Sequence, residues 1–162
     1  MTFVFEKPAG TKREIFHDLA LQARGLFKGE RDAVANAANL SSLIFTSLDD
    51  LNWAGFYFLK DGMLVLGPFQ GRPACVRIEM GRGVCGTAAA QRETVVVEDV
   101  EKFPGHIACD VASRSEIVIP LIRDGRLIGV LDIDAPVHAR FDAEDRTGLE
   151  NLARLWLEAS DI

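Results

Sequence analysis

The sequence predicts an α+β domain with an antiparallel sheet of about six strands and helices packed mainly on one face. Helical periodicity marks both ends of the chain and one short central segment. Short apolar runs fill the middle, and two turns that end in Asp-Gly separate pairs of these runs as in β-hairpins. Because no repeat or linker divides the 162 residues, we expect one domain over residues 1–162.

Two amphipathic helices are predicted at the start of the chain. Residues 11–28 repeat apolar side chains at the i, i+3, i+4 spacing of a helix with one buried face. Residues from about 32 to 48 carry a second apolar face, and the polar segment Asp49–Asn52 ends it. Both helices should therefore pack against the sheet or against each other.

The central part of the chain predicts a hairpin and a short helix. Residues 53–59, rich in aromatic side chains, and residues 63–66 flank the turn Lys60–Gly62. Residues 75–78 are typical of another short strand. The Gly-rich segment 81–91 is typical of a loop that enters a short helix.

The second half predicts the remaining strands. A strand at 94–97 is followed by an irregular excursion over residues 98–115. The runs 116–122 and 126–133 flank an Arg-Asp-Gly turn and should form the second hairpin. Asp142 is the predicted N-cap of a final amphipathic helix.

Composition excludes several classes of protein. A net charge of -6 without a dense Lys/Arg cluster argues against a nucleic-acid partner. No apolar run is long enough to span a membrane, and no secretory signal is visible. We therefore expect a protein of the reducing cytoplasm, in which a disulfide would be transient and catalytic or regulatory.

The three cysteines stand in charged or Gly-rich settings, whereas inert core cysteines lie in plain apolar runs. Cys85 follows a Gly-rich turn at a helix start, and Cys109 lies three residues after His106; such settings can stabilise a thiolate. Simple burial remains the alternative for each cysteine, Cys75 included. We expect no zinc, because no Cys-x-x-Cys pair or helical His pair is present.

Acidic and aromatic side chains form the other candidate site. Strand alternation places Asp132 and Asp134 on one face, where paired carboxyl groups raise each other's pKa and suit proton donation. Glu116 begins a strand after a polar loop. Trp53 and Tyr57 are four residues apart and share a face. The alternative for the acids is a solvated strand end. The alternative for the aromatic residues is ordinary core packing.

Together these segments resemble the free methionine-(R)-sulfoxide reductases, which are single GAF domains turned into thiol enzymes. The order of elements alone resembles GAF domains in general, which bind small molecules. The three cysteines in their order are the more specific sign. The matching segments are Gln70–Gly71, Ala74–Ile78, Gly81–Thr87, Gly105–Asp110, Ser113–Ile117 and Gly129–Asp134.

The resemblance implies a thiol reaction that reduces free L-methionine-R-sulfoxide. It makes Cys109 the nucleophile that becomes a sulfenic acid, and Cys85 the favoured resolving thiol. Cys75 could share that role or accept the disulfide afterwards, and the sequence does not decide which cysteine pairs first with Cys109. Thioredoxin is the implied reductant, a homodimer through the N-terminal helix is possible, and we expect no cofactor.

The remaining residues take substrate-binding roles by the same resemblance. Glu116, Asp132 and Asp134 would bind the sulfoxide oxygen and the ammonium group, with Glu116 as the proton donor. Trp53 and Tyr57 would hold the S-methyl group. Two rival functions are a GAF sensor that binds a cyclic nucleotide or other metabolite, and a redox sensor with a regulatory disulfide.

Overall fold

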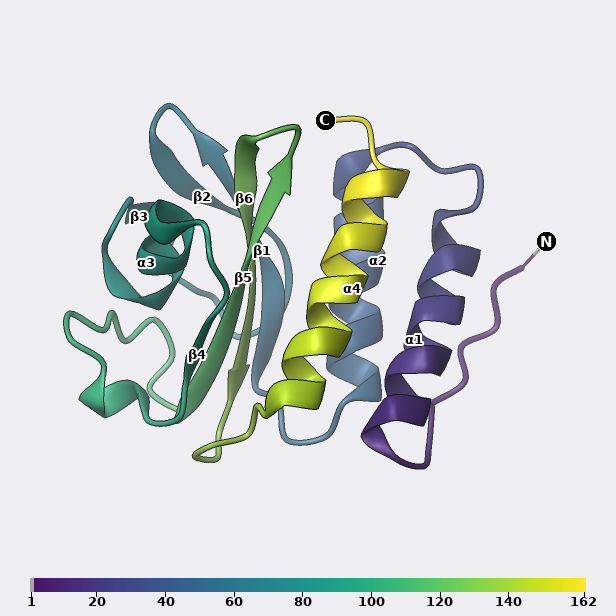
Figure 1. Cartoon of the computed structure of the whole chain (residues 1–162), viewed down its shortest axis with the longest axis horizontal. Coiled ribbons are helices and arrows are strands. Elements are labelled where there is room, and N and C mark those ends of the chain that lie inside the picture. Colours follow the sequence, from purple (N-terminus) through teal and green to yellow (C-terminus); the bar gives the residue numbers. More distant parts are fainter. Residues whose placement is uncertain (1) are drawn as a thin grey trace.

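The computed structural model describes residues 2–162 and shows one antiparallel sheet with helices on both faces (Figure 1). The predicted helices and strands all form, although the strand expected at 63–66 extends to Gly71 and the strand expected at 75–78 starts only at Arg77. In chain order they are α1 (Lys12–Phe27), α2 (Ala33–Ser47), β1 (Trp53–Lys60), β2 (Met63–Gly71), β3 (Arg77–Glu79), α3 (Gly83–Gln91), β4 (Val95–Val97), η1 (Val100–Lys102), β5 (Ser115–Arg123), β6 (Arg126–Ala135) and α4 (Ala143–Ala159).

The strand order in the sheet is β3-β2-β1-β6-β5-β4. Both predicted hairpins are confirmed, since β1 pairs with β2 and β5 pairs with β6. The turn residues Asp61 and Gly62 have φ of 51° and 79°, and Asp124 and Gly125 have 51° and 74°. Two consecutive left-handed residues fit the right-handed twist of the flanking strands, which explains the choice of Asp-Gly.

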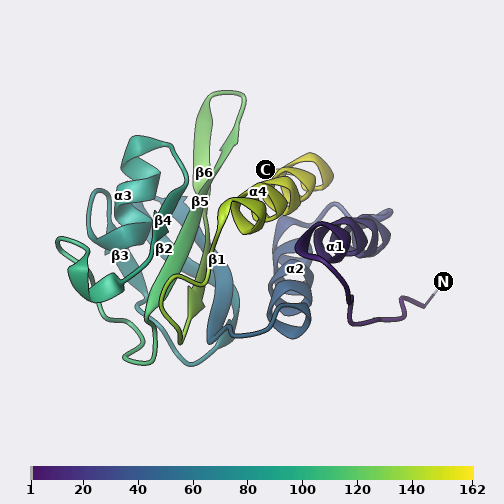
Figure 2. The ribbon, with the colours of Figure 1, turned by 60° about the horizontal axis from the view of Figure 1, so that its bottom comes forward.

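Helices lie mainly on one face of the sheet, as predicted (Figure 2). Helices α2 and α4 pack against this face, and α1 packs on them from outside. Helix α4 begins at its predicted N-cap, because the Asp142 side chain accepts hydrogen bonds from the backbone amides of Glu144 and Asp145. The pairing of α1 with a second copy of the chain stays a prediction. None of the helices in residues 2–162 is both long and apolar enough to cross a bilayer.

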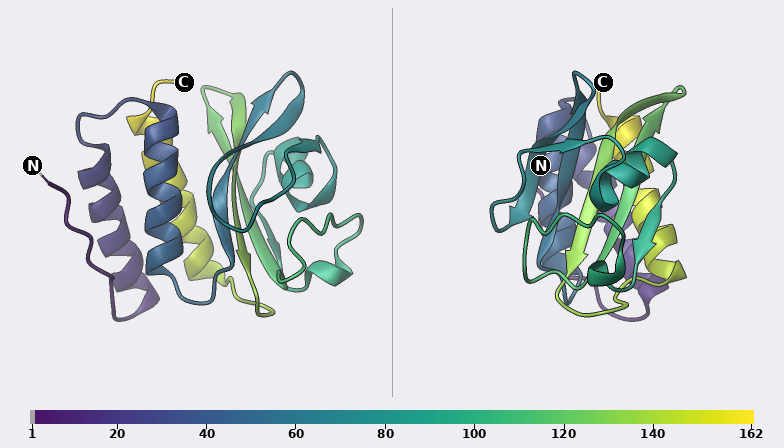
Figure 3. Two further views of the ribbon diagram at one scale, coloured as in Figure 1. Left: turned by 180° about the vertical axis from the view of Figure 1, so that it is seen from behind. Right: turned by 90° about the vertical axis from the view of Figure 1, so that its left-hand side faces the viewer.

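The two faces of the sheet carry separate cores. Phe56, Leu131 and Ile133 point toward α2 and α4, while their neighbours in sequence point the other way. Trp53 and Tyr57 belong to the opposite face, which α3 and the irregular segment after β4 cover (Figure 3). This second face, with one short helix over it, leaves room for a site.

Candidate active site

A cavity on the α3 face of the sheet brings together nearly every residue that the sequence singled out. It lies between strands β1, β5 and β6, the first turn of α3 and the irregular segment before β5. Its free volume is about 40 Å³, enough for water but not for an amino acid. Of the predicted site residues it is lined by Trp53, Tyr57, Cys85, Cys109, Glu116, Asp132 and Asp134; Cys75 lies outside the lining.

Strand register explains why three carboxyl groups meet here. Glu116 on β5 is the direct cross-strand partner of Asp134 on β6, and Asp132 lies two residues before Asp134 on the same face. Glu116 and Asp132 are each only 6% exposed. Ile133 points to the other core, as predicted.

Burial sets the protonation of these acids. It raises the pKa of Glu116 well above its usual range, and the charges of Asp132 and Asp134 raise it further. Burial also raises the pKa of Asp132, to about 6, and burial with the charge of Asp132 raises the pKa of Asp134. Burial therefore favours the protonated form of both Glu116 and Asp134, and a carboxyl group that keeps its proton can serve as a general acid.

One buried oxygen in the site is unusual. Within residues 2–162, Oδ1 of Asp132 has no hydrogen-bond partner. The side chains of Glu116 and Cys85 both lie within hydrogen-bonding reach of the Asp132 carboxyl group. The three side chains therefore form one buried, interacting group.

Cys85 is buried at the bottom of the cavity, in the first turn of α3. That turn starts at Gly83, where a φ of 61° favours glycine and a side chain would press against Ile107. The Sγ of Cys85 donates a hydrogen bond to Oε1 of Glu116 over 3.8 Å. Burial, and then the charges of Asp132 and Glu116, raise the pKa of this thiol well above its usual range.

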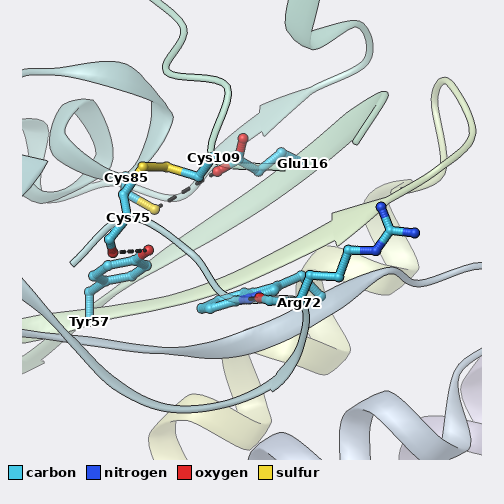
Figure 4. Close-up of a disulfide and its surroundings, with 7 residues drawn as sticks. Tyr57, Arg72, Cys75, Cys85, Cys109 and Glu116 are labelled. Carbon is cyan, nitrogen blue, oxygen red and sulfur yellow. Dashed lines mark hydrogen bonds between the residues drawn. A yellow bond between two sulfur atoms is a disulfide. The ribbon is translucent and has the colours of Figure 1, made fainter. Parts of the chain in front are cut away.

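Cys109 forms a disulfide with Cys75, with the two Cα atoms 5.5 Å apart (Figure 4). The sequence favours Cys85 as the resolving thiol, whereas the bonded partner of Cys109 is Cys75; which of the two resolves stays a prediction. Cys75 and Cys109 both lie on loops that flank the cavity, whereas Cys85 is 4% exposed and fixed in a helical turn. A helix start can stabilise a thiolate, but here burial among carboxyl groups outweighs that effect.

The aromatic wall of the cavity also anchors the loop that carries Cys75. The rings of Trp53 and Tyr57 stack with centroids 5.8 Å apart, so their predicted common face is confirmed. The indole Nε1 of Trp53 donates to the carbonyl of Arg72 over 3.1 Å. The hydroxyl group of Tyr57 donates to the carbonyl of Cys75 over 2.9 Å (Figure 4). Both side chains therefore fix the position of Cys75 as well as the wall.

Several residues of the site escaped the sequence analysis. The amide Nδ2 of Asn52 donates to Asp110 and to Ser113, each over 3.0 Å, and ties the Cys109 loop to the start of β1. His106, left out of the predicted catalytic set, lines the cavity, and burial lowers its pKa. Arg82 lines it too. Ser113 belongs to Ser113–Ile117, one of the segments that match the reductases. Nothing in the local pattern around Asn52 signals the role of Asn52.

Known proteins share this architecture along most of the chain. The family model for the GAF domain matches residues 35–156. A free methionine-R-sulfoxide reductase of Escherichia coli is 55% identical over 141 residues, which are 87% of this chain and 86% of that protein. The reductase of the same name from Saccharomyces cerevisiae is 49% identical, over 89% of this chain and 84% of its own.

A solved structure agrees with these relatives. The free methionine-R-sulfoxide reductase of Neisseria meningitidis, determined in complex with its substrate, is 42% identical with a TM-score of 0.93, covering 98% of this chain and 95% of its own. These likenesses extend over most of the chain. The chain therefore belongs to the GAF domain family and, within it, to the free methionine-R-sulfoxide reductases.

Proposed function

We propose that this chain reduces free L-methionine-R-sulfoxide to methionine in the cavity beside Cys109. The observation that carries the proposal is the meeting of Cys109 with three buried or half-buried acids in one cavity. Burial and like charges raise the pKa of one of these acids, Glu116, and so favour its protonated form. Sulfoxide reduction needs these two parts, a thiol and an acid.

In the proposed reaction, the thiol of Cys109 attacks the sulfoxide sulfur while Glu116 protonates the oxygen. The protonated oxygen passes from the substrate sulfur to Sγ of Cys109 as the new sulfur–sulfur bond breaks. Methionine leaves with that electron pair, and the two-electron oxidation leaves Cys109 as a sulfenic acid. The thiol of Cys75 then condenses with this sulfenic acid, which forms the disulfide and releases water. A dithiol of the thioredoxin class reduces the disulfide and becomes a disulfide itself.

The cavity seats the two ends of the substrate differently. Asp132 and Asp134 offer carboxylates to the substrate ammonium group, and Glu116 offers its proton to the sulfoxide oxygen. The stacked rings of Trp53 and Tyr57 hold the S-methyl group. Because the disulfide form has only about 40 Å³ free, we infer that reduction and separation of the Cys75 and Cys109 loops precede substrate entry.

The chain should reject blocked and peptide-bound substrates. An N-acetyl group removes the charge that Asp132 and Asp134 would bind, and it leaves buried carboxylates without a partner. We expect kcat/KM for N-acetyl-methionine-R-sulfoxide to fall by more than about a hundredfold relative to the free amino acid, as sites built for a polar group discriminate strongly. The S epimer serves as a control for the sulfur centre. Comparable rates for free and N-acetylated substrate would remove the acids from ammonium binding.

Cys75 and Cys85 should differ when each is replaced by serine. In Cys75→Ser we expect one methionine per chain without external reductant, a sulfenic acid at Cys109 and almost no thioredoxin-driven turnover. Cys85→Ser should still form the Cys75–Cys109 disulfide, because its sulfur is not part of that bond. A sulfenic-acid probe and mass spectrometry of the disulfides provide the readout. The reverse pattern, with thioredoxin turnover lost only in Cys85→Ser, would make Cys85 the resolving thiol.

A further inference from the structure

Three side chains under the disulfide form a compact set of metal-ligand atoms. The thiol of Cys85 comes from α3, and the carboxyl groups of Glu116 and Asp132 come from β5 and β6. One ligand atom from each lies within 4.8 Å of the other two, and all three residues are buried. The elements that hold them are a helix and two adjacent strands of the sheet, β5 and β6.

One atom of this set points to a positively charged ligand. The Oδ1 of Asp132, a residue that lines the cavity and is 6% exposed, has no hydrogen-bond partner in residues 2–162. A buried acceptor without a donor costs free energy, so any group that supplies positive charge here is favoured. A metal ion supplies that charge, and its binding releases the protons of its ligands.

The separation of two of the ligand atoms is close to that around a tetrahedral ion. Sulfur and oxygen ligands at the usual zinc distances are about 3.5 Å apart around a tetrahedral centre. The Sγ of Cys85 and Oε1 of Glu116 are 3.8 Å apart, so a small side-chain rotation brings both into range. Three protein ligands leave the fourth position for water or for Asp134, which lines the same cavity.

The donor atoms select the class of ion. Magnesium and calcium take all-oxygen sites with six or more ligands. A thiolate with two carboxylates and few positions instead suits zinc and the related ions Co²⁺ and Cd²⁺. Coordination removes the thiol proton, which overcomes the raised pKa that burial gives Cys85.

We propose that Cys85, Glu116 and Asp132 bind a thiophilic divalent cation of the zinc class, and that this cation inhibits the enzyme by occupying the place of the substrate's polar groups. Spacing along the chain gives no sign of this site, because its ligands come from three separate elements. The inhibition rests on the proposed function, while the binding does not. The metal site gives a separate role to Cys85, which the Cys75–Cys109 disulfide leaves as a free thiol.

Cobalt absorption tests the binding directly. In the disulfide form Cys85 is the one remaining thiol of the three cysteines, so a sulfur-to-cobalt charge-transfer band reports this residue alone. We expect Co²⁺ to produce this band and Zn²⁺ to abolish it. Cys85→Ala should lack the band, and Asp132→Asn should weaken Co²⁺ binding by more than about tenfold, since even outer ligand contacts are worth that much. Asp49→Asn, a surface control, should leave binding unchanged.

Access to the cavity and folding are checked separately. The double variant Cys75→Ser, Cys109→Ser also has Cys85 as its one thiol, and it lacks the disulfide that narrows the cavity. Circular dichroism confirms that each variant folds. Absence of the band in both the disulfide form and the double variant at saturating Co²⁺, or an unchanged affinity in a folded Asp132→Asn, would overturn the site.

Inhibition has its own measurement. With a phosphine reductant that does not chelate zinc, Zn²⁺ should raise the apparent KM for methionine-R-sulfoxide without lowering kcat. An unchanged KM despite cobalt binding would reject the inhibitory role and keep the site. Cobalt binding without any reductase activity would reject the proposed function and leave the metal site standing.

Discussion

Replacement of Cys109 by serine is expected to abolish methionine formation in a single turnover, even with excess dithiothreitol. The sulfoxide oxygen must pass to a sulfur nucleophile, and Cys109 is the cysteine that both lines the cavity and stands on a loop. Serine keeps the size of the side chain, but its hydroxyl group is not nucleophilic enough toward a sulfoxide. Chromatographic measurement of methionine after one enzyme equivalent gives the result.

The matched control for this experiment is Cys75→Ser, which removes the other half of the disulfide. It should still yield one methionine per chain, because resolution follows the reduction of the substrate. Normal yield in Cys109→Ser would exclude Cys109 from the chemistry and leave Cys85 as the remaining cavity thiol.

Replacement of Glu116 by glutamine should slow the chemical step by about 10²–10⁴-fold, the usual contribution of a general acid. Glutamine keeps the size and the hydrogen bonds of the side chain but has no carboxylic proton. Substrate affinity should change much less, because the amide can still donate to the sulfoxide oxygen. Rapid-quench measurement of methionine separates the chemical step from binding.

The pH dependence of the same step gives an independent check. Burial raises the pKa of Glu116 and favours the protonated acid, so the wild-type rate should fall as pH rises through that pKa. Glu116→Gln should lose this alkaline limb. Alkylation of reduced Cys109 should be nearly unchanged in the variant, which controls for damage to the nucleophile. A wild-type rate in Glu116→Gln would move the acid role to Asp132 or Asp134, and their Asn variants would be measured next.

The local pattern of apolar and turn residues was sufficient to predict the helices, the strands and the two hairpins. It also predicted which site residues share a face of the sheet. Alternation along β6 predicts that Asp132 and Asp134 point together with Ile133 opposite, and the structure agrees. The Asp-Gly turns predict both hairpins, because their backbone conformation depends on the turn residues themselves. The cross-strand contact of Glu116 with Asp134 needs the register of β5 with β6. Sequence spacing alone does not supply that register.

The disulfide pairing could not be predicted for a related reason. Cys75 and Cys109 are 34 residues apart and meet through two loops that the sheet and the Asn52 and Tyr57 hydrogen bonds position. Cys85 has the local signature of a reactive thiol, a helix start after a Gly-rich turn. Its burial beside carboxyl groups, which raises its pKa, arises only when α3 packs on β5 and β6.

The most direct test of the proposed function is a stoichiometric reaction of the reduced protein without any added reductant. Mixed with excess L-methionine-R-sulfoxide, each chain should form one methionine and one disulfide, and peptide mapping should place that disulfide between Cys75 and Cys109. The S epimer should give no methionine under the same conditions. Failure to form methionine from the R epimer, with all three thiols still free, would contradict the assignment of this chain as a free methionine sulfoxide reductase.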